Sequence, residues 1–215
     1  MIIAIDGPAA SGKSTTARLL ADKLDFIHLN SGLMYRAVTY IFIKNGFLNK
    51  EISLNRFFTD IDLEFNGKNL DSVFYNGKDI SSFLNDENIN ENIKIVSNNK
   101  LIRKKLIELQ REIVKDENVV CEGRDIGSVV FPNAEFKFYL NANIEKRAER
   151  RFNEISKSDS EISKKSILEN LKKRDSNDIN RKNSPLIKVS DCIEIDTTEL
   201  TINQQVEYIY SIIMK

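Results

Sequence analysis

Neither sign of charge predominates in this sequence, and its apolar runs are short. Lysine and arginine together number 32, as do aspartate and glutamate. A basic excess is the usual mark of nucleic-acid binding, so no nucleic-acid partner is expected. The longest apolar stretches, such as residues 40–43 and 119–121, are far below the roughly 20 residues that cross a bilayer. The first residues have no basic segment before an apolar one, so neither a secretory signal nor a membrane partner is predicted.

Cysteine and histidine are scarce. Cys121 and Cys192 lie in or beside apolar runs, at a spacing unlike that of metal sites or disulfide frameworks. They are predicted to be inert core thiols in a reducing, cytoplasmic compartment. The one histidine, His28, lies in a predicted strand, where a structural role is favoured over a catalytic one. Histidine catalysis is therefore not expected.

The order of the predicted elements indicates an α/β fold. With 215 residues, 41% hydrophobic and 30% charged, the chain suits one globular domain with insertions. Strand-like and helix-like segments alternate, which predicts a central parallel sheet with helices on both faces. The predicted strands are residues 2–5, 26–29, 119–122, 135–140 and 193–195. The predicted helices are residues 13–24, 31–46 with Ser31 as the cap, 144–155, about 166–179, and a terminal helix from Thr201.

Two segments interrupt this alternation. Residues 62–65, 72–75 and 78–80 are short strand-like runs separated by Asn-Gly turns, which predicts a small antiparallel insert. Residues 86–116 follow with helical spacing and predict two helices. Residues 156–166 lack apolar side chains, so they are interpreted either as a mobile lid or as a plain surface loop.

A phosphate-binding pattern lies between the first predicted strand and the first predicted helix. Residues 7–14 read G-P-A-A-S-G-K-S and match G-x-x-x-x-G-K-[ST], in which backbone N–H groups and a helix N-terminus surround phosphates. Lys13 would contact the β- and γ-phosphates and Ser14 would bind Mg²⁺. Asp6, just before the loop, either faces the phosphates or caps the loop. The predicted ATP-binding residues are Gly7, Pro8, Ala9, Ala10, Ser11, Gly12, Lys13, Ser14 and Thr15.

A second polar group is expected at the same edge of the sheet. Residues 122–125 read E-G-R-D and directly follow the strand at 119–121. The carboxyl ends of parallel strands meet at one edge, so this turn should lie beside the phosphate loop. Arg124 could form a bidentate contact with phosphate, and Asp125 could accept from an amine; a plain ion pair between neighbours is the alternative. Arg36, early in the helix that follows the second strand, would point into the same cleft.

Arginines on two later helices complete the candidate site. Arg174, Asp178 and Arg181 fall at i, i+4 and i+7, which is one stripe of a helix, and Arg147, Arg150 and Arg151 crowd an earlier helix. They are either solvated surface charges or clamps for a phosphoryl group. Transfer to an ionised phosphate oxygen needs positioning, Mg²⁺ and cations, but no strong general base.

Together these motifs resemble the bacterial cytidylate kinase family, over essentially the whole chain. The blocks that carry the resemblance are residues 7–8 with 12–15, 29–32 with 35–36, 123–127 with 131–132, 147–148 with 150–151, 174–175 with 178 and 181, and 184–186. Other P-loop kinases share only the first of these blocks, residues 7–8 with 12–15. The resemblance implies a P-loop nucleoside monophosphate kinase fold, with a monophosphate-binding insert at about 36–112 and a lid at about 150–172. It also implies ATP-dependent phosphorylation of CMP and dCMP, with Mg²⁺.

The resemblance also assigns roles to residues. Ser31, Arg36 and Arg124 would hold the acceptor phosphate, and Arg103 with Asp125 the cytosine. Asp178, with Arg174 or Arg181, would hold the ribose or the transferring phosphate. The CMP site implied in this way comprises Ser31, Tyr35, Arg36, Arg103, Gly123, Arg124, Asp125, Arg174, Asp178 and Arg181. The implied catalytic groups are Lys13, Arg124, Arg150, Arg151, Arg174 and Arg181, and the metal would contact Ser14 and, through water, Glu122.

Four positions depart from the family's pattern. Lys94 stands where a serine beside the base is usual, and Asn85 where an arginine is common. Asn30 and Glu122 each replace an aspartate. A lysine cannot accept a hydrogen bond from the cytosine amine as a serine oxygen can.

Two other functions remain compatible with the residues. One is a kinase for UMP or another small acceptor, and the other is a non-catalytic ATP-binding switch. Arginine pairs on two separate helices favour a charge clamp over a switch. No heptad pattern is present, so a monomer is expected.

Overall fold

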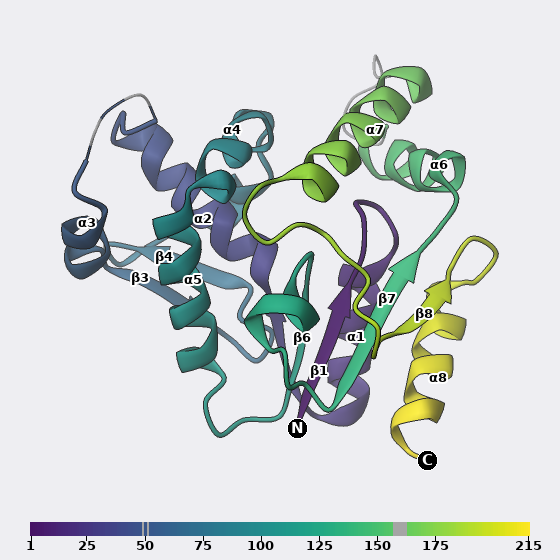
Figure 1. Cartoon of the computed structure of the whole chain (residues 1–215). Coiled ribbons are helices and arrows are strands. Elements are labelled where there is room, and N and C mark those ends of the chain that lie inside the picture. Colours follow the sequence, from purple (N-terminus) through teal and green to yellow (C-terminus); the bar gives the residue numbers. More distant parts are fainter. Residues whose placement is uncertain (49, 51, 157–162) are drawn as a thin grey trace.

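The computed structural model describes residues 1–48, 50, 52–156 and 163–215, and a parallel sheet of five strands forms the centre of this part of the chain (Figure 1). The strands are β1 (Ile2–Asp6), β2 (Ile27–Asn30), β6 (Val119–Gly123), β7 (Phe136–Asn141) and β8 (Ile193–Asp196). They lie in the order β2-β6-β1-β7-β8, and every neighbouring pair is parallel. All five were predicted from the sequence, to within one residue at each end.

Alternate side chains of β1 face opposite layers of helices. Ile3 and Ile5 belong to a buried cluster that includes residues of α1 (Lys13–Leu24) and α8 (Ile202–Ile213). Ala4 belongs to a second cluster, formed with α2 (Ser31–Lys44) and α5 (Lys100–Ile113) on the other face. A parallel sheet must be covered on both faces, which explains why its inner strands β1 and β6 are buried along almost their whole length. The predicted α/β architecture is confirmed.

A small antiparallel sheet packs against α2. Its strands are β3 (Leu63–Asn66), β4 (Ser72–Tyr75) and β5 (Lys78–Asp79), in the order β3-β4-β5. Gly67 and Gly77 have φ angles of 85° and 69°, the left-handed conformation that such turns require. Val73 of β4 and Ala37 of α2 share one buried cluster. The antiparallel insert is therefore present, as the Asn-Gly turns predicted.

Other elements agree only partly with the predictions. Helices α4 (Glu87–Asn98) and α5 confirm the two helices expected within residues 86–116. Helix α3 (Leu54–Asp60), the 3₁₀ turn Ser81–Asn85 and the π-helical turn Ile126–Val130 were not predicted. Each is at most seven residues long, which is too short to show a clear apolar periodicity.

The prediction of Ser31 as the cap of α2 and the prediction that Arg174, Asp178 and Arg181 share one helix were wrong. The N-cap of α2 is Asn30, whose side chain accepts from the Leu33 N–H at 3.1 Å, and Ser31 is already helical. Either residue type can cap a helix, so the sequence alone did not distinguish them. Helix α7 (Lys164–Asn180) ends before Arg181, whose backbone is extended. Only Arg174 and Asp178 of the predicted stripe therefore lie on one helix.

Helices α6 (Ile144–Ile155) and α7 pack on each other above the phosphate loop (Figure 1). Ala9 of the loop, Ala148 of α6, and Ile167 and Leu171 of α7 form one buried apolar cluster. The lid predicted at about 150–172 spans the end of α6 and the start of α7. Its central residues, 157–162, lie outside the described residues.

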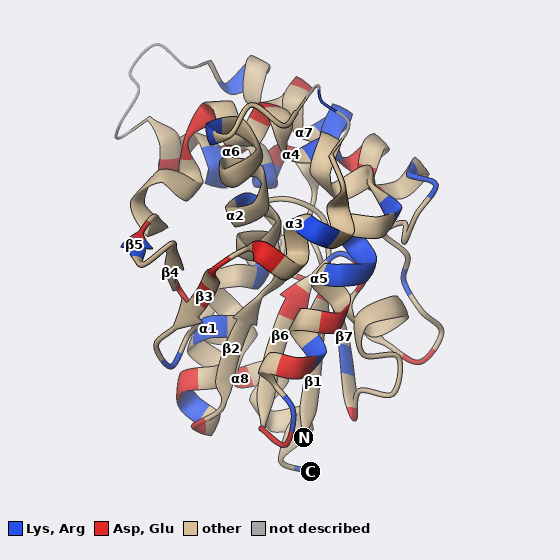
Figure 2. Cartoon of the chain, turned by 90° about the vertical axis from the view of Figure 1, so that its left-hand side faces the viewer, with Lys and Arg blue, Asp and Glu red and all other residues tan. Residues whose placement is uncertain are grey.

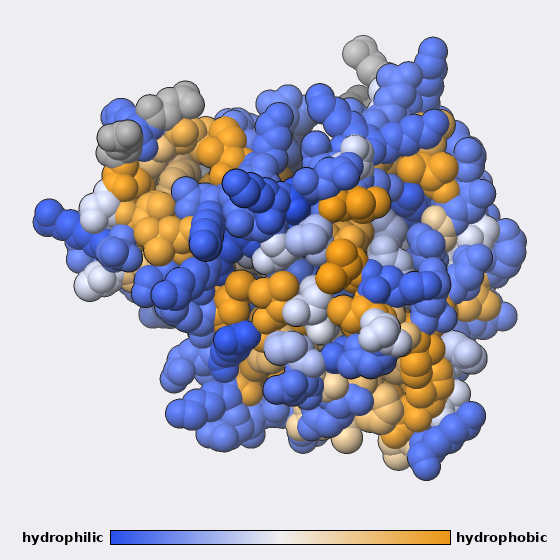
Figure 3. All heavy atoms as spheres, viewed as in Figure 1, coloured by the Kyte–Doolittle hydropathy of each residue, from blue (hydrophilic) through white to orange (hydrophobic). Residues whose placement is uncertain are grey.

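The surface agrees with the balanced composition. Positive and negative residues are interspersed over the side of the molecule seen in Figure 2. Hydrophilic residues predominate on the face seen in Figure 3, where apolar residues form separate patches. No helix in the described ranges combines the length and the hydropathy needed to cross a membrane.

Candidate active site

The loop between β1 and α1 has the backbone that its two glycines make possible. Gly12 is the N-cap of α1 and has a φ of 92°, in the left-handed region. Gly7 has a φ of 154°, and a Cβ there would lie 2.1 Å from the Leu140 carbonyl oxygen. The loop can therefore approach the end of β7 only because residue 7 lacks a side chain.

Lys13 is buried at the base of this loop. Its Nζ donates to the Pro8 carbonyl at 3.2 Å, and 6% of the residue is exposed. The pKa of Lys13 is lowered to about 7. Burial is the main cause and the charge of Arg124 acts in the same direction, whereas Glu122 opposes the shift. An anion bound nearby would restore the charged form. Ser14 and Thr15, which follow, are exposed at the start of α1.

Asp6 caps the turn that follows β6. Its two carboxylate oxygens accept from the backbone N–H groups of Ile126 and Gly127, both at 2.8 Å. Burial nevertheless raises its pKa to about 6, and the charge of Asp125 acts in the same direction. Of the two roles expected for Asp6, the structure shows a capping role, although the capped turn is the one after β6 and not the phosphate loop.

The turn after β6 lies directly beside the phosphate loop, as the parallel sheet predicted. Asp6 and Gly123 are partners in the register of β1 and β6. Ser31 donates its hydroxyl to the Glu122 carbonyl at 2.8 Å, and a Cβ on Gly123 would lie 2.5 Å from that hydroxyl. Glu122 is 2% exposed, and its Oε1 has no hydrogen-bond partner among the described residues. This turn is therefore closely packed and carries one unsatisfied carboxylate oxygen.

Arg124 connects this turn to helix α7. Its Nε donates to Asp178 Oδ2 at 2.8 Å, and the two side chains are 15% and 19% exposed. Burial alone would raise the pKa of Asp178, but Arg124 and then Arg174 lower it overall. The carboxylate is thus held in its charged form between two guanidinium groups.

Four arginines, Arg36, Arg124, Arg151 and Arg174, lie close enough to influence one another's charge beside Lys13, and the space between them is called the hollow below. Arg174 is an exposed residue, and its pKa is lowered to about 10 by desolvation of the guanidinium and then by the charges of Arg124, Arg36 and Arg151. The pKa of Arg36 is likewise lowered, first by burial and then by Arg151 and Arg124. Asp178 and Glu154 pair with two of these arginines and do not balance all four charges. The hollow is therefore an electropositive site suited to phosphate groups.

Arg36 also contacts the insert. Its guanidinium donates to the Leu84 carbonyl at 2.9 Å and to Asn90 Oδ1 at 2.8 Å. Both acceptors are neutral, so they leave the positive charge of Arg36 uncompensated. Lys94 and Asn85, the two departures from the family pattern in this region, are both exposed.

A second cluster lies deeper, between α5 and the turn after β6. Arg103 donates to Asp125 Oδ2, and Arg181 Nη2 lies 3.4 Å from Asp125 Oδ1. The guanidinium carbon of Arg103 is 5.4 Å from the centroid of the Tyr35 ring. Burial raises the pKa of Tyr35 to about 12. The structure thus brings together Tyr35, Arg103, Asp125 and Arg181, four of the ten residues predicted to bind CMP.

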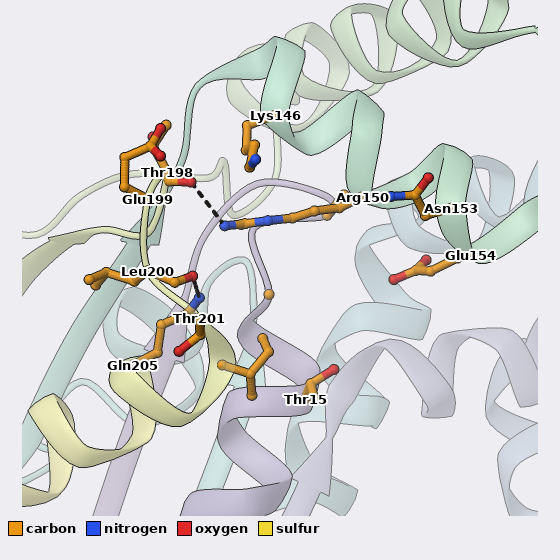
Figure 4. Close-up of a pocket in the computed structure, with 13 residues that line it drawn as sticks. Thr15, Lys146, Arg150, Asn153, Glu154, Thr198, Glu199, Leu200, Thr201 and Gln205 are labelled. Carbon is orange, nitrogen blue, oxygen red and sulfur yellow. Dashed lines mark hydrogen bonds between the residues drawn. The ribbon is translucent and has the colours of Figure 1, made fainter.

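Arg150 does not face the hollow. It extends across a separate pocket of about 490 Å³, which lies between α6, the phosphate loop and the segment 198–202 (Figure 4). Its guanidinium donates to the Thr197 carbonyl, to Thr197 Oγ1 at 3.1 Å and to the Ser11 carbonyl at 3.4 Å. Arg151, the next residue, instead pairs with Glu154 at 2.9 Å near the hollow.

Sequence reasoning missed the residues that build this pocket. Gln205 is fully buried; its Oε1 accepts from Thr16 Oγ1 at 2.8 Å and its Nε2 donates to the Leu200 carbonyl at 3.1 Å. Thr197 is also fully buried and donates to the Ser11 carbonyl at 3.0 Å. No motif marks either residue, because each acts on segments almost 190 positions away.

Comparison with known proteins assigns this arrangement to a family. The family model described as cytidylate kinase matches residues 3–215. The chain belongs to the cytidylate kinase family. It is 42% identical to a cytidylate kinase of Fusobacterium nucleatum subsp. nucleatum over 97% of the chain and 95% of that protein. It is also 42% identical to a cytidylate kinase of Caldanaerobacter subterraneus subsp. tengcongensis, over 99% of the chain and 94% of that protein.

A solved structure shares the fold at low identity. An uncharacterized protein from Eubacterium ventriosum superposes with a TM-score of 0.54 at 13% identity, over 100% of the chain and 99% of that protein. This likeness concerns the fold alone. Membership of the cytidylate kinase family rests on the family model and on the relatives at 42% identity.

Proposed function

We propose that this cleft transfers the γ-phosphate of ATP to CMP, giving ADP and CDP, the activity that the name of its family denotes. One observation carries the proposal: the hollow lined by Arg36, Arg124, Arg151 and Arg174 lies beside Lys13 of the phosphate loop. Two anionic substrates can meet there. The switch alternative is not favoured, because a binding switch needs no second phosphate site.

ATP would occupy the loop and the neighbouring pocket. Its phosphates would accept from the backbone N–H groups of residues 7–15 and from Lys13. Its adenine would enter the pocket of about 490 Å³ that Arg150 crosses, because this space opens directly from Gly12 and Thr15. A guanidinium can stack on such a ring. Arg150 is therefore assigned to the donor nucleotide.

CMP would bind on the insert side of the hollow. Its phosphate would contact Arg36 and Arg124, and its cytosine would lie near Asp125, whose carboxylate can accept from the exocyclic amine. Ser31 and Gly123 shape the turn beneath it, and residues 36–112 form the wall over it. The contacts assigned to Arg36, Arg124 and Asp125 reach the phosphate or the base, so dCMP is expected to make the same three contacts.

The residues present fit a magnesium ion. Glu122 has a buried oxygen without a partner, and Ser14 has an exposed hydroxyl at the start of α1. Mg²⁺ takes most of its oxygen ligands from water and nucleotide phosphates, so these two groups suffice. The bound ion would neutralise charge on the phosphates of ATP.

The chain's own residues then act by position and charge. The acceptor phosphate oxygen of CMP is already ionised, so no side chain must remove a proton. Lys13, Arg124 and Arg174 surround the space between the two substrates and would stabilise the charge that spreads over the transferring group. Residues 150–172 are proposed as the lid that excludes water from this space.

An assay of ADP release tests the proposal. CMP, dCMP, UMP, AMP and a blank without acceptor are compared at equal concentration. Turnover with CMP and dCMP should exceed the blank by at least about a hundredfold, as expected for an enzyme of this class. The proposal fails if no monophosphate raises turnover above the blank. A higher kcat/KM for UMP than for CMP would instead reassign the acceptor.

A further inference from the structure

Arg147, a buried arginine that faces neither the pocket nor the hollow, contacts three separate segments. It is 5% exposed. Its Nε donates to the Ala142 carbonyl after β7 at 3.1 Å, and its Nη1 donates to the Ala9 carbonyl in the phosphate loop at 3.1 Å. Its Nη2 donates to Asp175 Oδ2 on α7 at 2.6 Å. One rigid guanidinium thus joins the sheet, the phosphate loop and α7.

The contact to Asp175 fixes the face that α7 turns toward the loop. Asp175 lies one turn after Leu171, which packs with Ala9 in the apolar cluster between α6 and α7. Apolar packing alone is not directional, so it leaves a helix free to rotate slightly about its axis. A hydrogen-bonded ion pair between two nearly buried side chains, 6% and 14% exposed, removes that freedom.

Arg174 immediately precedes Asp175 and faces the hollow. Successive residues on a helix are separated by about 100° around its axis, so one side chain cannot be fixed without fixing the other's direction. Asp178, on the same side of α7 as Arg174, pairs with Arg124 at 2.8 Å. The aim of Arg174 therefore depends on the rotation of α7 relative to the phosphate loop.

We propose that Asp175 is a positioning residue, which through Arg147 fixes the rotation of α7 against the phosphate loop and so aims Arg174 at the transferring phosphate. The inference rests on the proposed function, in which Arg174 stabilises the phosphoryl group during transfer. Asp175 itself touches neither substrate. A misplacement of about 1 Å in such a site can cost a hundredfold in rate, so the contribution is measurable.

A double-mutant cycle between Asp175→Asn and Arg174→Ala tests the proposal. Asparagine keeps an oxygen that can accept from Arg147 but loses the charge. With both substrates saturating, we expect Asp175→Asn to lower kcat about tenfold in the wild-type background and less than about twofold when Arg174 is already alanine. The KM for ATP should change little in either background. A loss of the same factor in both backgrounds, or no loss in either, overturns the proposal.

Three further variants keep the test decisive. Asn177→Ala, a change at an exposed position of the same helix outside residues 150–172, is the control and should leave kcat unchanged. Arg147→Lys alters the other partner of the Arg147–Asp175 pair. Its loss of kcat should likewise be smaller when Arg174 is already alanine, and this variant keeps the test available if Asp175→Asn does not fold. Asp175→Ala should lose more activity than Asp175→Asn. Equal losses would point to a general loss of packing and against positioning.

The outcomes separate this inference from the proposed function. If the wild type transfers no phosphate to CMP, the proposed function fails. If the wild type is active and Arg174→Ala lowers kcat, but the cycle is additive, the function stands and only the role of Asp175 is wrong.

Discussion

Arg103 and Asp125 form an ion pair that is almost completely buried, with side chains 3% and 6% exposed. Arg181 approaches the other oxygen of the same carboxylate at 3.4 Å. Asp125 therefore balances two arginines in the absence of substrate. In the proposed complex, cytosine would therefore share the Asp125 carboxylate with Arg103 and Arg181.

This relationship predicts different results for two substitutions of Asp125. Alanine would leave Arg103 and Arg181 buried without a counter-ion, so Asp125→Ala should destabilise the fold by about 3–5 kcal/mol. Asp125→Asn keeps an oxygen for Arg103 and should lose less stability, while kcat/KM for CMP falls about tenfold or more because the amide is a weaker acceptor. Urea unfolding and steady-state kinetics measure the two effects. Equal stability of both variants would contradict the structural role assigned to Asp125.

Lys13 should make ATP capture sensitive to pH. Its pKa in the free protein is lowered to about 7, so the charged form is lost as pH rises through that value. We expect kcat/KM for ATP to fall by up to about tenfold per pH unit above 7. With ATP saturating, the phosphates favour the protonated amine, so kcat should vary less. The matched control is Lys13→Arg, because a guanidinium stays charged over this range, and its profile should be flatter. Parallel profiles for both proteins would rule Lys13 out as the titrating group.

Lys13→Ala removes the charge altogether. Loss of one preorganised donor to a developing charge typically costs about a hundredfold to a thousandfold in kcat, and this loss is expected here. CMP affinity, measured by calorimetry without ATP, should change little because Lys13 belongs to the donor loop. An unchanged kcat would contradict the assignment of residues 7–15 to the ATP phosphates.

Gly7 should be far less replaceable than Gly77, although both have positive φ. A Cβ at residue 7 would meet the Leu140 carbonyl at 2.1 Å, whereas a Cβ at residue 77 meets nothing within 4 Å. Gly77→Ala should therefore cost only the conformational strain, about 1 kcal/mol. Gly7→Ala should cost about 3 kcal/mol or more, because backbone must move. Denaturant unfolding compares them, and equal losses would show that the loop tolerates the methyl group.

Gln205 should affect ATP binding more than CMP binding. Gln205→Leu leaves the Thr16 hydroxyl and the Leu200 carbonyl without their present partner, at a cost of about 1–3 kcal/mol in stability. Because Leu200 and Gln205 line the pocket beside the phosphate loop, the KM for ATP should rise severalfold while the KM for CMP stays the same. Gln204→Ala, a change at the exposed neighbour that completes the capping box of α8 with Thr201, is the control. A rise in both KM values would indicate a general loss of structure.

The sequence predicted the parts of the fold that depend on local pattern. The inner strands β1 and β6 begin with continuous apolar runs, and the loop from Gly7 to Ser14 carries its own signature, so the order of residues alone is enough to locate both. The placement of this loop and of the turn after β6 at one edge of the sheet followed from the rule that the carboxyl ends of parallel strands lie at the same edge. The choice of Asn30 over Ser31 as a cap could not be predicted, because both side chains have a suitable acceptor.

The remaining parts of the site depend on contacts between distant segments. The family resemblance implied a catalytic role for Arg150, and the direction of its side chain is determined by Thr197, which lies 47 residues later. Gln205 reaches Thr16 across 189 positions. Such pairs leave no periodicity and no motif, so only the folded chain shows them. The assignments of individual residues to ATP and CMP remain predictions.

The pairing of Asp6 with Gly123 in the register of β1 and β6 has a consequence for how this protein can change. Adjacent strands lie about 4.8 Å apart, so backbone hydrogen bonds fix the separation of the donor loop from the acceptor turn. The insert at about 36–112 lies in the chain between these two points, but it does not set this distance. The insert can therefore be lengthened, shortened or exchanged to alter which acceptor is chosen, while the path of the phosphate stays the same.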